Sequence, residues 1–207
     1  SLLKMLERIS YDQIYDEHAH VFSVTALQNL MNRNGLEIFR VENLVVHGGS
    51  NRIYACKLGT RKVENSVLEN LSLEQEYGIQ ELATYEKFAK KVATSKDALV
   101  ELLTNMKKEG RKVVSYGATS KSTTVFNYCG IGPDLIDYIV DTTEAKQGKL
   151  SPGMHIPVIP PHSGFDDTVD VAFLGAWNYK KEILTKEEGF LRNGGRFITH
   201  IPRVRII

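Results

Sequence analysis

A dense group of polar side chains near residue 15 carries the residue types that proton transfer needs. Residues 11–20 contain two histidines, three acidic residues and two tyrosines. Histidine is the usual proton acceptor near neutral pH, and a neighbouring carboxylate can set its tautomer and raise its basicity. A tyrosine hydroxyl can stabilise an oxyanion or an enolate. A zinc site is a competing functional interpretation, because His and Glu also bind zinc, and a solvated polar loop is the non-functional one.

A second group of chemically suggestive residues is the turn at residues 116–121, which reads Tyr-Gly-Ala-Thr-Ser-Lys. It follows a predicted strand and leads into a predicted helix. Free N–H groups at a helix start favour an anion, and a lysine adds a full charge, so a phosphate is the expected ligand. The alternative is a tight turn with a surface lysine. The turn lacks the G-x-G-x-x-G dinucleotide motif. Its candidate substrate ligands are Tyr116, Thr119, Ser120 and Lys121.

Other predicted strand ends supply three further candidates for substrate binding. In an open α/β sheet, ligands bind outside the carboxyl ends of the strands. Asp141 ends a predicted strand and could bond a ribose hydroxyl, or it could be a solvated aspartate. Trp177 and Asn178 follow another strand, where a cleft-lining role competes with the commoner core tryptophan.

The elements that must position these groups begin with a helix and a strand pair. Apolar side chains recur at helical spacing within residues 27–31, and the Asn-Gly pair at 34–35 ends this helix. Residues 36–46 and 51–58 read as strands joined by a His-Gly-Gly-Ser turn. So short a connection predicts an antiparallel hairpin.

Two helices are expected next. The first has an apolar stripe over residues 82–92, and Ser72 with Gln75 fits a capping box near its start. The second has an apolar stripe over residues 99–106 and stops at Gly110.

The remaining sequence alternates strands with helices. Strands are expected at residues 112–116, 135–140, 156–159, 170–174 and 196–200, with helices at 122–129 and 179–191. This order predicts an α/β fold, a Rossmann-like and mostly parallel sheet with helices on both faces.

Bulk composition excludes several classes of partner. The 207 residues are 42% hydrophobic and 25% charged, and the net charge is +1. Without a basic field, neither nucleic acid nor an anionic membrane is expected as a partner. No apolar run approaches the roughly 18 residues of a membrane span. Cys56 and Cys129 stand far apart in apolar surroundings, so we expect reduced core thiols in a cytoplasmic protein and no metal site.

Taken together and in order, these segments resemble one family. Residues 11–18 (YDQIYDEH), 21–23, 35–37 and 47–50, with Arg52 and Tyr54, resemble the end of the catalytic domain of sugar C-methyltransferases. The motifs at 116–121, 127–132, 141, 146–148, 152–153, 155–157, 176–178 and 194–197 resemble that family's C-terminal domain. The resemblance spans nearly the whole chain and is specific in order and spacing.

The resemblance implies S-adenosylmethionine-dependent methylation of a carbon in a keto-deoxysugar that is linked to a nucleoside diphosphate. It also implies three domains: a zinc-binding one, a methyltransferase one and an α/β one. Residues 1–62 would be the methyltransferase tail, with its helix and strand pair, 63–109 a helical connector and 110–207 the C-terminal domain. The zinc-binding and methyl-donor domains would lie upstream. We therefore expect S-adenosylmethionine in the full-length enzyme but no tight binding to this chain.

The resemblance assigns three catalytic roles. His18 would remove the proton next to the ketone as general base, Glu17 would orient it, and Tyr15 would stabilise the enolate. The family usually has a histidine where this chain has Asp16, which leaves any auxiliary role of that position open.

Three hypotheses follow from the sequence. The first is the base-bearing and substrate-bearing part of a C-methyltransferase, inactive alone, with a nucleotide-diphosphate sugar as ligand. The second is a non-catalytic Rossmann-like module that binds a nucleotide or a coenzyme. The third is a structural domain that forms a homodimer through the helices of residues 72–109.

Overall fold

The computed structural model describes all 207 residues, and the chain forms two units. Unit 1 contains Ser1–Ile9 and His18–Lys91, and unit 2 contains Ser10–Glu17 and Val92–Ile207. A short segment near the N-terminus therefore belongs with the C-terminal half of the sequence. The domain boundaries expected at residues 62 and 109 stay predictions. None of the helices combines the length and the apolar character that a membrane span needs.

Unit 1 combines a hairpin with helices. Its elements are α1 (Leu2–Arg8), α2 (Val24–Arg33), β1 (Leu36–Leu44), η2 (Val46–Gly48), β2 (Ser50–Lys57), α3 (Asn65–Tyr77) and the first part of α4 (Leu82–Lys108). The expected antiparallel pairing of β1 with β2 is confirmed. Ser23 caps α2 by accepting a hydrogen bond from the N–H of Ala26. The buried carboxylate of Glu74 in α3 accepts from the N–H groups of Val24 and Thr25, at 2.7 and 2.8 Å.

The helical region differs from the expectation in two ways. Ser72 lies inside α3, where its hydroxyl donates to Glu76, so the expected capping box is wrong. The chain breaks instead at Gly78, whose φ of 76° is the left-handed conformation that glycine adopts without strain. Beyond it, α4 is one helix of 27 residues rather than two. Residues 93–98, between the two apolar stripes, contain neither glycine nor proline to interrupt it.

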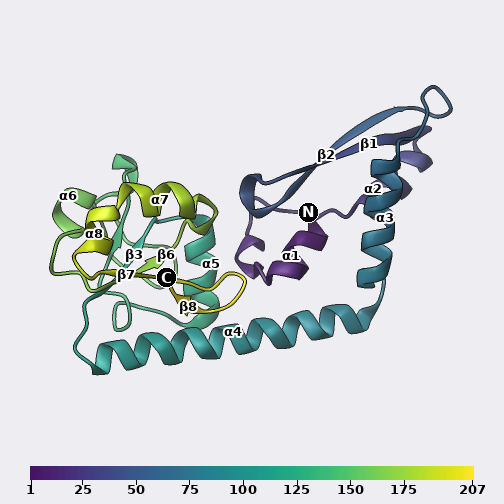
Figure 1. Cartoon of the computed structure of the whole chain (residues 1–207). Coiled ribbons are helices and arrows are strands. Elements are labelled where there is room, and N and C mark those ends of the chain that lie inside the picture. Colours follow the sequence, from purple (N-terminus) through teal and green to yellow (C-terminus); the bar gives the residue numbers. More distant parts are fainter. The chain divides into compact units, whose positions relative to one another are not determined.

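Unit 2 is built on a six-stranded sheet with the order β5-β4-β3-β6-β7-β8. Figure 1 labels four of its strands, β3, β6, β7 and β8. All pairs are parallel except β7 with β8. The elements are η1 (Tyr11–Gln13), β3 (Val113–Tyr116), α5 (Ser120–Cys129), β4 (Ile139–Val140), η3 (Glu144–Lys146), β5 (Val158–Ile159), α6 (Pro161–Gly164), β6 (Val171–Leu174), η4 (Trp177–Tyr179), α7 (Lys180–Lys186), α8 (Glu188–Arg192), β7 (Arg196–Thr199) and β8 (Arg205–Ile206). The predicted α/β class with a mostly parallel sheet is confirmed.

Three boundaries in unit 2 differ from the expected ones. The strand β4 is short because the N–H groups of Leu135 and Ile136 both bond the carbonyl of Gly132, which makes a turn there. The single helix expected at 179–191 is divided between α7 and α8 at Glu187. The exposed strand β8 has no counterpart among the expected strands.

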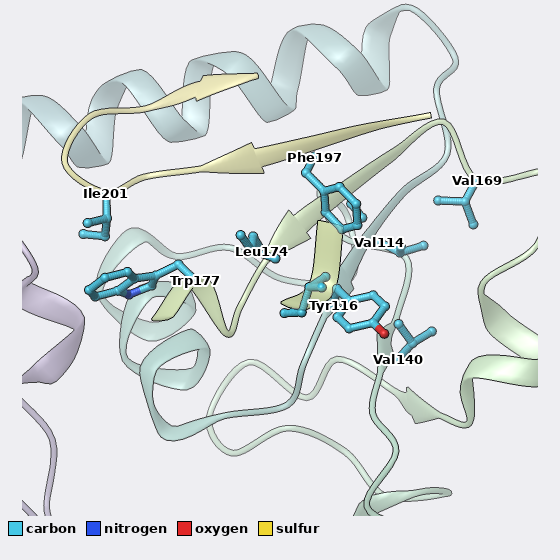
Figure 2. Close-up of a cluster of buried hydrophobic side chains, with 10 residues drawn as sticks. Val114, Tyr116, Val140, Val169, Leu174, Trp177, Phe197 and Ile201 are labelled. Atoms are coloured by element: carbon cyan, nitrogen blue, oxygen red, sulfur yellow. The ribbon is translucent and has the colours of Figure 1, made fainter. Parts of the chain in front are cut away.

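Helices flank both faces of the sheet. On one face, Tyr116, Val140 and Phe197 belong to an apolar cluster (Figure 2). Ile183 of α7 is part of this cluster, and Phe190 of α8 packs against it. On the other face, the ring of Phe173 from β6 packs on Phe126 of α5, with centroids 5.4 Å apart. Successive side chains of a strand point to opposite faces, so both packings follow from fully buried strands such as β6. This core holds the carboxyl ends of the strands in place.

Candidate functional site

A cavity of about 660 Å³ lies in unit 2, next to the start of α5. Four parts of the chain meet there: residues 15–17, the turn and α5 as far as Asn127, the loop of residues 145–152, and Val158 of β5. Its lining is Tyr15, Asp16, Glu17, Ala118, Thr119, Ser120, Thr123, Thr124, Asn127, Ala145, Lys146, Lys149, Leu150, Ser151, Pro152 and Val158. Small-molecule sites fall in this range of volume, with an apolar body and a few converging polar groups.

A capping box shapes the cavity wall at the start of α5. The Thr119 hydroxyl accepts from the N–H of Ser122 at 3.0 Å and donates to the carbonyl of Gly175 at 2.7 Å. The Ser122 hydroxyl in return accepts from the N–H of Thr119 at 2.9 Å. These bonds give the helix start a defined geometry, and the partial positive charge of a helix N-terminus favours an anion. Ser120 is exposed and lines the cavity beside them.

Lys121 does not line the cavity. Its side chain is about nine-tenths buried, and its Nζ lies 5.4 Å from the centre of the Tyr15 ring, which does line it. A cation over an aromatic face is attracted by about 0.5–2 kcal/mol, depending on its exposure. Lys121 therefore helps to hold the Tyr15 ring.

The hydroxyl of Tyr15 is suited to act as a hydrogen-bond donor. Burial, and then the negative charges of Glu17 and Asp12, raise the pKa of Tyr15 above its ordinary value. The phenol stays protonated at neutral pH and can donate to an oxygen that gains negative charge.

Asp141 is engaged by the protein itself. Its carboxylate accepts from the N–H of Ala118 at 2.7 Å and from that of Thr143 at 2.8 Å, and it lies 3.5 Å from Nζ of Lys146. Burial alone would raise the pKa of Asp141, but these hydrogen bonds and the lysine charge together lower it. The ammonium of Lys146 also donates to the carbonyl of Ala118 at 2.7 Å. Asp141 thus braces the turn behind the cavity and is not among its lining residues.

The remaining candidates for substrate binding lie outside the cavity lining. The hydroxyl of Tyr116 donates to Glu187 at 2.6 Å, and Tyr116 packs in the apolar cluster. Trp177 belongs to the same cluster and donates its indole N–H to Asp12. Asn178 follows it in η4. Of the predicted substrate ligands, only Thr119 and Ser120 line the cavity, and binding roles for all seven stay predictions.

The three predicted catalytic residues divide between the units. Tyr15 and Glu17 line the cavity of unit 2, whereas His18, the next residue, is exposed and belongs to unit 1. The catalytic roles of His18, Glu17 and Tyr15 stay predictions. Nowhere in the chain do three or more His, Cys, Asp or Glu side chains gather as a metal ion would require.

Besides Asp16, six polar lining residues were not predicted as ligands from the sequence: Thr123, Thr124, Asn127, Lys146, Lys149 and Ser151. Thr123 and Asn127 lie on the second and third turns of α5, and Lys146 and Lys149 lie beyond β4. The two lysines could have been found, since they follow the carboxyl end of the strand next to β3, where open α/β sheets place their ligands. The sequence did not show that Thr123 and Asn127 of α5 line the same cavity as the loop of residues 145–152.

Comparison with known proteins identifies the family of the chain. The sequence model of the C-methyltransferase C-terminal domain matches residues 45–202. The chain belongs to this family. It is similar to the C-methyltransferase NovU of Streptomyces niveus, with 37% identity over 207 residues, all of this chain and 49% of NovU. The chain thus spans about half the length of that C-methyltransferase, and the methyltransferase family expected from the motifs is confirmed.

Proposed function

We propose that this chain is the substrate-binding and base-bearing part of an S-adenosylmethionine-dependent C-methyltransferase that acts on a nucleotide-linked keto-deoxysugar. The single observation that carries the proposal is the cavity itself. It joins Tyr15 and Glu17 of the family-like motif to the start of α5 and to two lysines. Membership of a C-methyltransferase family supplies the reaction class.

The lining suits the two ends of a nucleotide sugar. Lys149, with the hydroxyl of Ser120 at the helix start, provides positive charge and donors for a diphosphate. Lys146 lines the cavity beside them, although its ammonium also bonds the carbonyl of Ala118 and pairs with Asp141. Tyr15, Asp16 and Glu17 provide a donor and acceptors for a sugar ketone and its hydroxyl groups.

Proton removal is the chemistry that this chain would supply. A proton next to a ketone is weakly acidic. In the proposal His18 takes that proton, Glu17 orients the imidazole, and the Tyr15 hydroxyl donates to the enolate oxygen. Removal of this proton makes the carbon next to the ketone electron-rich, and methylation at carbon requires an electron-rich carbon.

The residues of unit 2 do not suit S-adenosylmethionine itself. The turn after β3 has only Gly117 in place of a glycine-rich loop, and the Ala118 N–H is already bonded to Asp141. Asp141, where a ribose ligand would be expected, is occupied by its own bonds. We therefore propose that the methyl donor is held by a part of the protein corresponding to the other half of NovU, and that this chain alone transfers no methyl group.

The alternative, a binding module without catalysis, gains less support from the geometry. A ligand at Lys121 with Tyr15 and His18 remote from it would favour this alternative. Tyr15 is not remote, since the Lys121 ammonium lies 5.4 Å from the centre of its ring.

Isothermal titration calorimetry on this chain tests the proposal. A panel of thymidine and other nucleoside diphosphate sugars is titrated into the wild type, Lys149→Met and Lys181→Met. Lys149 is exposed at the cavity, and Lys181 is an exposed lysine on α7 outside its lining. We expect a nucleotide sugar to bind and Lys149→Met to weaken it about tenfold, since a hydrogen bond to a charged group contributes about 1.5–3 kcal/mol. Lys181→Met should bind as the wild type does.

Two results would contradict the proposal. One is no binding of any nucleotide sugar by the folded chain. The other is equal affinity in Lys149→Met and Lys181→Met, which would put the ligand outside the cavity.

A further inference from the structure

The segment that carries Tyr15 and Glu17 is held in unit 2 by its first residues. Ser10–Glu17 belongs to unit 2, whereas the chain before and after it belongs to unit 1. Within the segment, Tyr11 is 4% exposed and Asp12 is 0% exposed, but Asp16 and Glu17 are exposed at the cavity. The buried start of the segment, which includes Tyr11 and Asp12, is therefore its contact with the rest of unit 2.

Asp12 meets two side chains from neighbouring strand ends. The indole N–H of Trp177, which follows β6, donates to Oδ2 of Asp12. The Nε2 of His200, which follows β7, lies 3.6 Å from the same oxygen, and His200 is 1% exposed. The other oxygen, Oδ1, has no hydrogen-bond partner.

The buried carboxylate of Asp12 is not expected to stabilise the folded protein by itself. Burying a carboxylate that accepts from a single N–H group is unfavourable, because the hydration it loses is only partly replaced. Buried polar groups do, however, specify one arrangement over its alternatives in several systems. The hydrogen bond between Asp12 and the indole N–H of Trp177 belongs to the register in which the structure holds the segment.

Tyr11 supports the same register by contacts around its ring. Its hydroxyl lies 3.6 Å from Sγ of Cys129, its ring meets His200 edge-on at 5.6 Å, and Tyr128 packs at 5.4 Å. Tyr11 and Asp12 together form the anchor of the segment. Both lie beside His200 of unit 2.

We propose that Asp12, which accepts a hydrogen bond from Trp177 and faces His200 without a hydrogen bond to it, is a positioning residue that sets Tyr15 and Glu17 in the cavity. Tyr15 stands three residues after Asp12, so it lies within about 10 Å of chain from the anchor. A slip of the anchor moves Tyr15 directly. The catalytic consequence rests on the proposed function, whereas the docking itself does not.

Hydrogen exchange of this chain, resolved by residue, tests the docking. Trp177→Phe keeps the aromatic packing but removes the only N–H that donates to Asp12. The amides of Gln13 and Ile14, which bond the carbonyls of Ser10 and Tyr11, report the segment. We expect them to exchange at least about tenfold faster, because a hydrogen bond to a charged group contributes more than tenfold to a local equilibrium.

Asp137→Asn is the matched control in the same unit. Asp137 accepts from Nζ of Lys107 at 2.8 Å and from the N–H of Val113 at 3.1 Å, and both partners lie outside residues 10–17. Its loss should speed exchange at Val113 and leave Gln13 and Ile14 unchanged. Wild-type exchange of the Gln13 and Ile14 amides in Trp177→Phe, or the same uniform increase in both variants, would overturn the proposal.

Asp12→Ala provides a second readout if Trp177→Phe does not fold. Trp177 is the single tryptophan of the chain, so its fluorescence reports the anchor without labelling. Loss of the carboxylate should shift the emission to longer wavelength and speed exchange at Ile14. An unchanged emission spectrum with unchanged exchange would overturn the proposal.

Kinetics of the full-length enzyme separate this inference from the proposed function. Trp177→Phe should lower kcat for methyl transfer about 10- to 100-fold, since a misplacement near 1 Å can have an effect of that size. The KM for the methyl donor should stay at the wild-type value, and a wild-type kcat would contradict the positioning role. Absence of methyl transfer in the wild type, with the exchange difference present, would refute the proposed function alone.

Discussion

Replacing Asp141 by Asn separates a bracing role in the turn from a role as a substrate ligand. The carboxylate accepts from the N–H groups of Ala118 and Thr143 at 2.7 and 2.8 Å, and it is 8% exposed. Asn keeps one acceptor oxygen but loses the charge and the second acceptor. One of the two hydrogen bonds is then lost, and the pairing with Lys146 is lost as well.

The expected loss of stability is about 2 kcal/mol, because a hydrogen bond to a charged group contributes about 1.5–3 kcal/mol. Urea unfolding followed by Trp177 fluorescence measures it, since the single tryptophan lies in unit 2. With a slope of about 1–3 kcal/mol per molar urea, the midpoint should fall by about 1 M. Asp134→Asn is the control: this exposed carboxylate in the same unit should change stability by less than about 0.5 kcal/mol.

The difference between the wild type and Asp141→Asn should depend on pH. Burial raises the pKa of Asp141, but the hydrogen bonds and Lys146 outweigh it, so the folded-state pKa lies below the usual value of about 3.9. Folding therefore favours the ionised form, and this stabilisation is fully present above about pH 5. It is lost as the pH falls through about 4 toward the folded-state pKa, and the two urea midpoints should converge there.

Equal midpoints of the wild type and Asp141→Asn at pH 7 would refute the bracing role. Unchanged stability together with weaker nucleotide-sugar binding would instead support Asp141 as a ligand.

Two further predictions concern the cavity wall and the thiols. Gly153→Ala should destabilise unit 2 by more than about 1 kcal/mol in the same urea assay, because Gly153 has φ +79° and a Cβ would stand 1.8 Å from Oδ1 of Asn127; wild-type stability would contradict this packing. Burial raises the pKa of the Cys129 thiol, so it should stay protonated and resist iodoacetamide at neutral pH, whereas the half-buried Cys56 should react. Mass spectrometry of the alkylated protein measures both, and equal rates would show that Cys129 is accessible.

Local sequence signals predicted the parallel sheet and the hairpin of unit 1. Turn glycines and apolar runs act over a few residues, so they located β3, β6 and β7 to within about one residue. The single helix α4 escaped because two apolar stripes on one helix resemble two helices when no breaker stands between them. The short edge strand β8 carries little apolar signal, since it is exposed.

The site was predictable only in part, because the cavity joins segments more than 100 residues apart in sequence. Tyr15 and Glu17 drew notice as a polar cluster, and Ser120 as a residue of a helix start. Their meeting depends on the burial of Asp12 against Trp177, a tertiary contact between residues 165 apart. Nor did the sequence show that the chain passes from unit 2 to unit 1 after Glu17.

Methyl transfer by the full-length enzyme with His18→Ala, compared with His20→Ala, tests the central claim most directly. Both histidines are exposed and belong to unit 1, two residues apart. If His18 is the general base, its loss should lower kcat by about 100- to 10,000-fold. Affinity for the nucleotide sugar should persist, and His20→Ala should stay near the wild-type rate. Wild-type turnover by His18→Ala, or an equal loss in both variants, would contradict the claim.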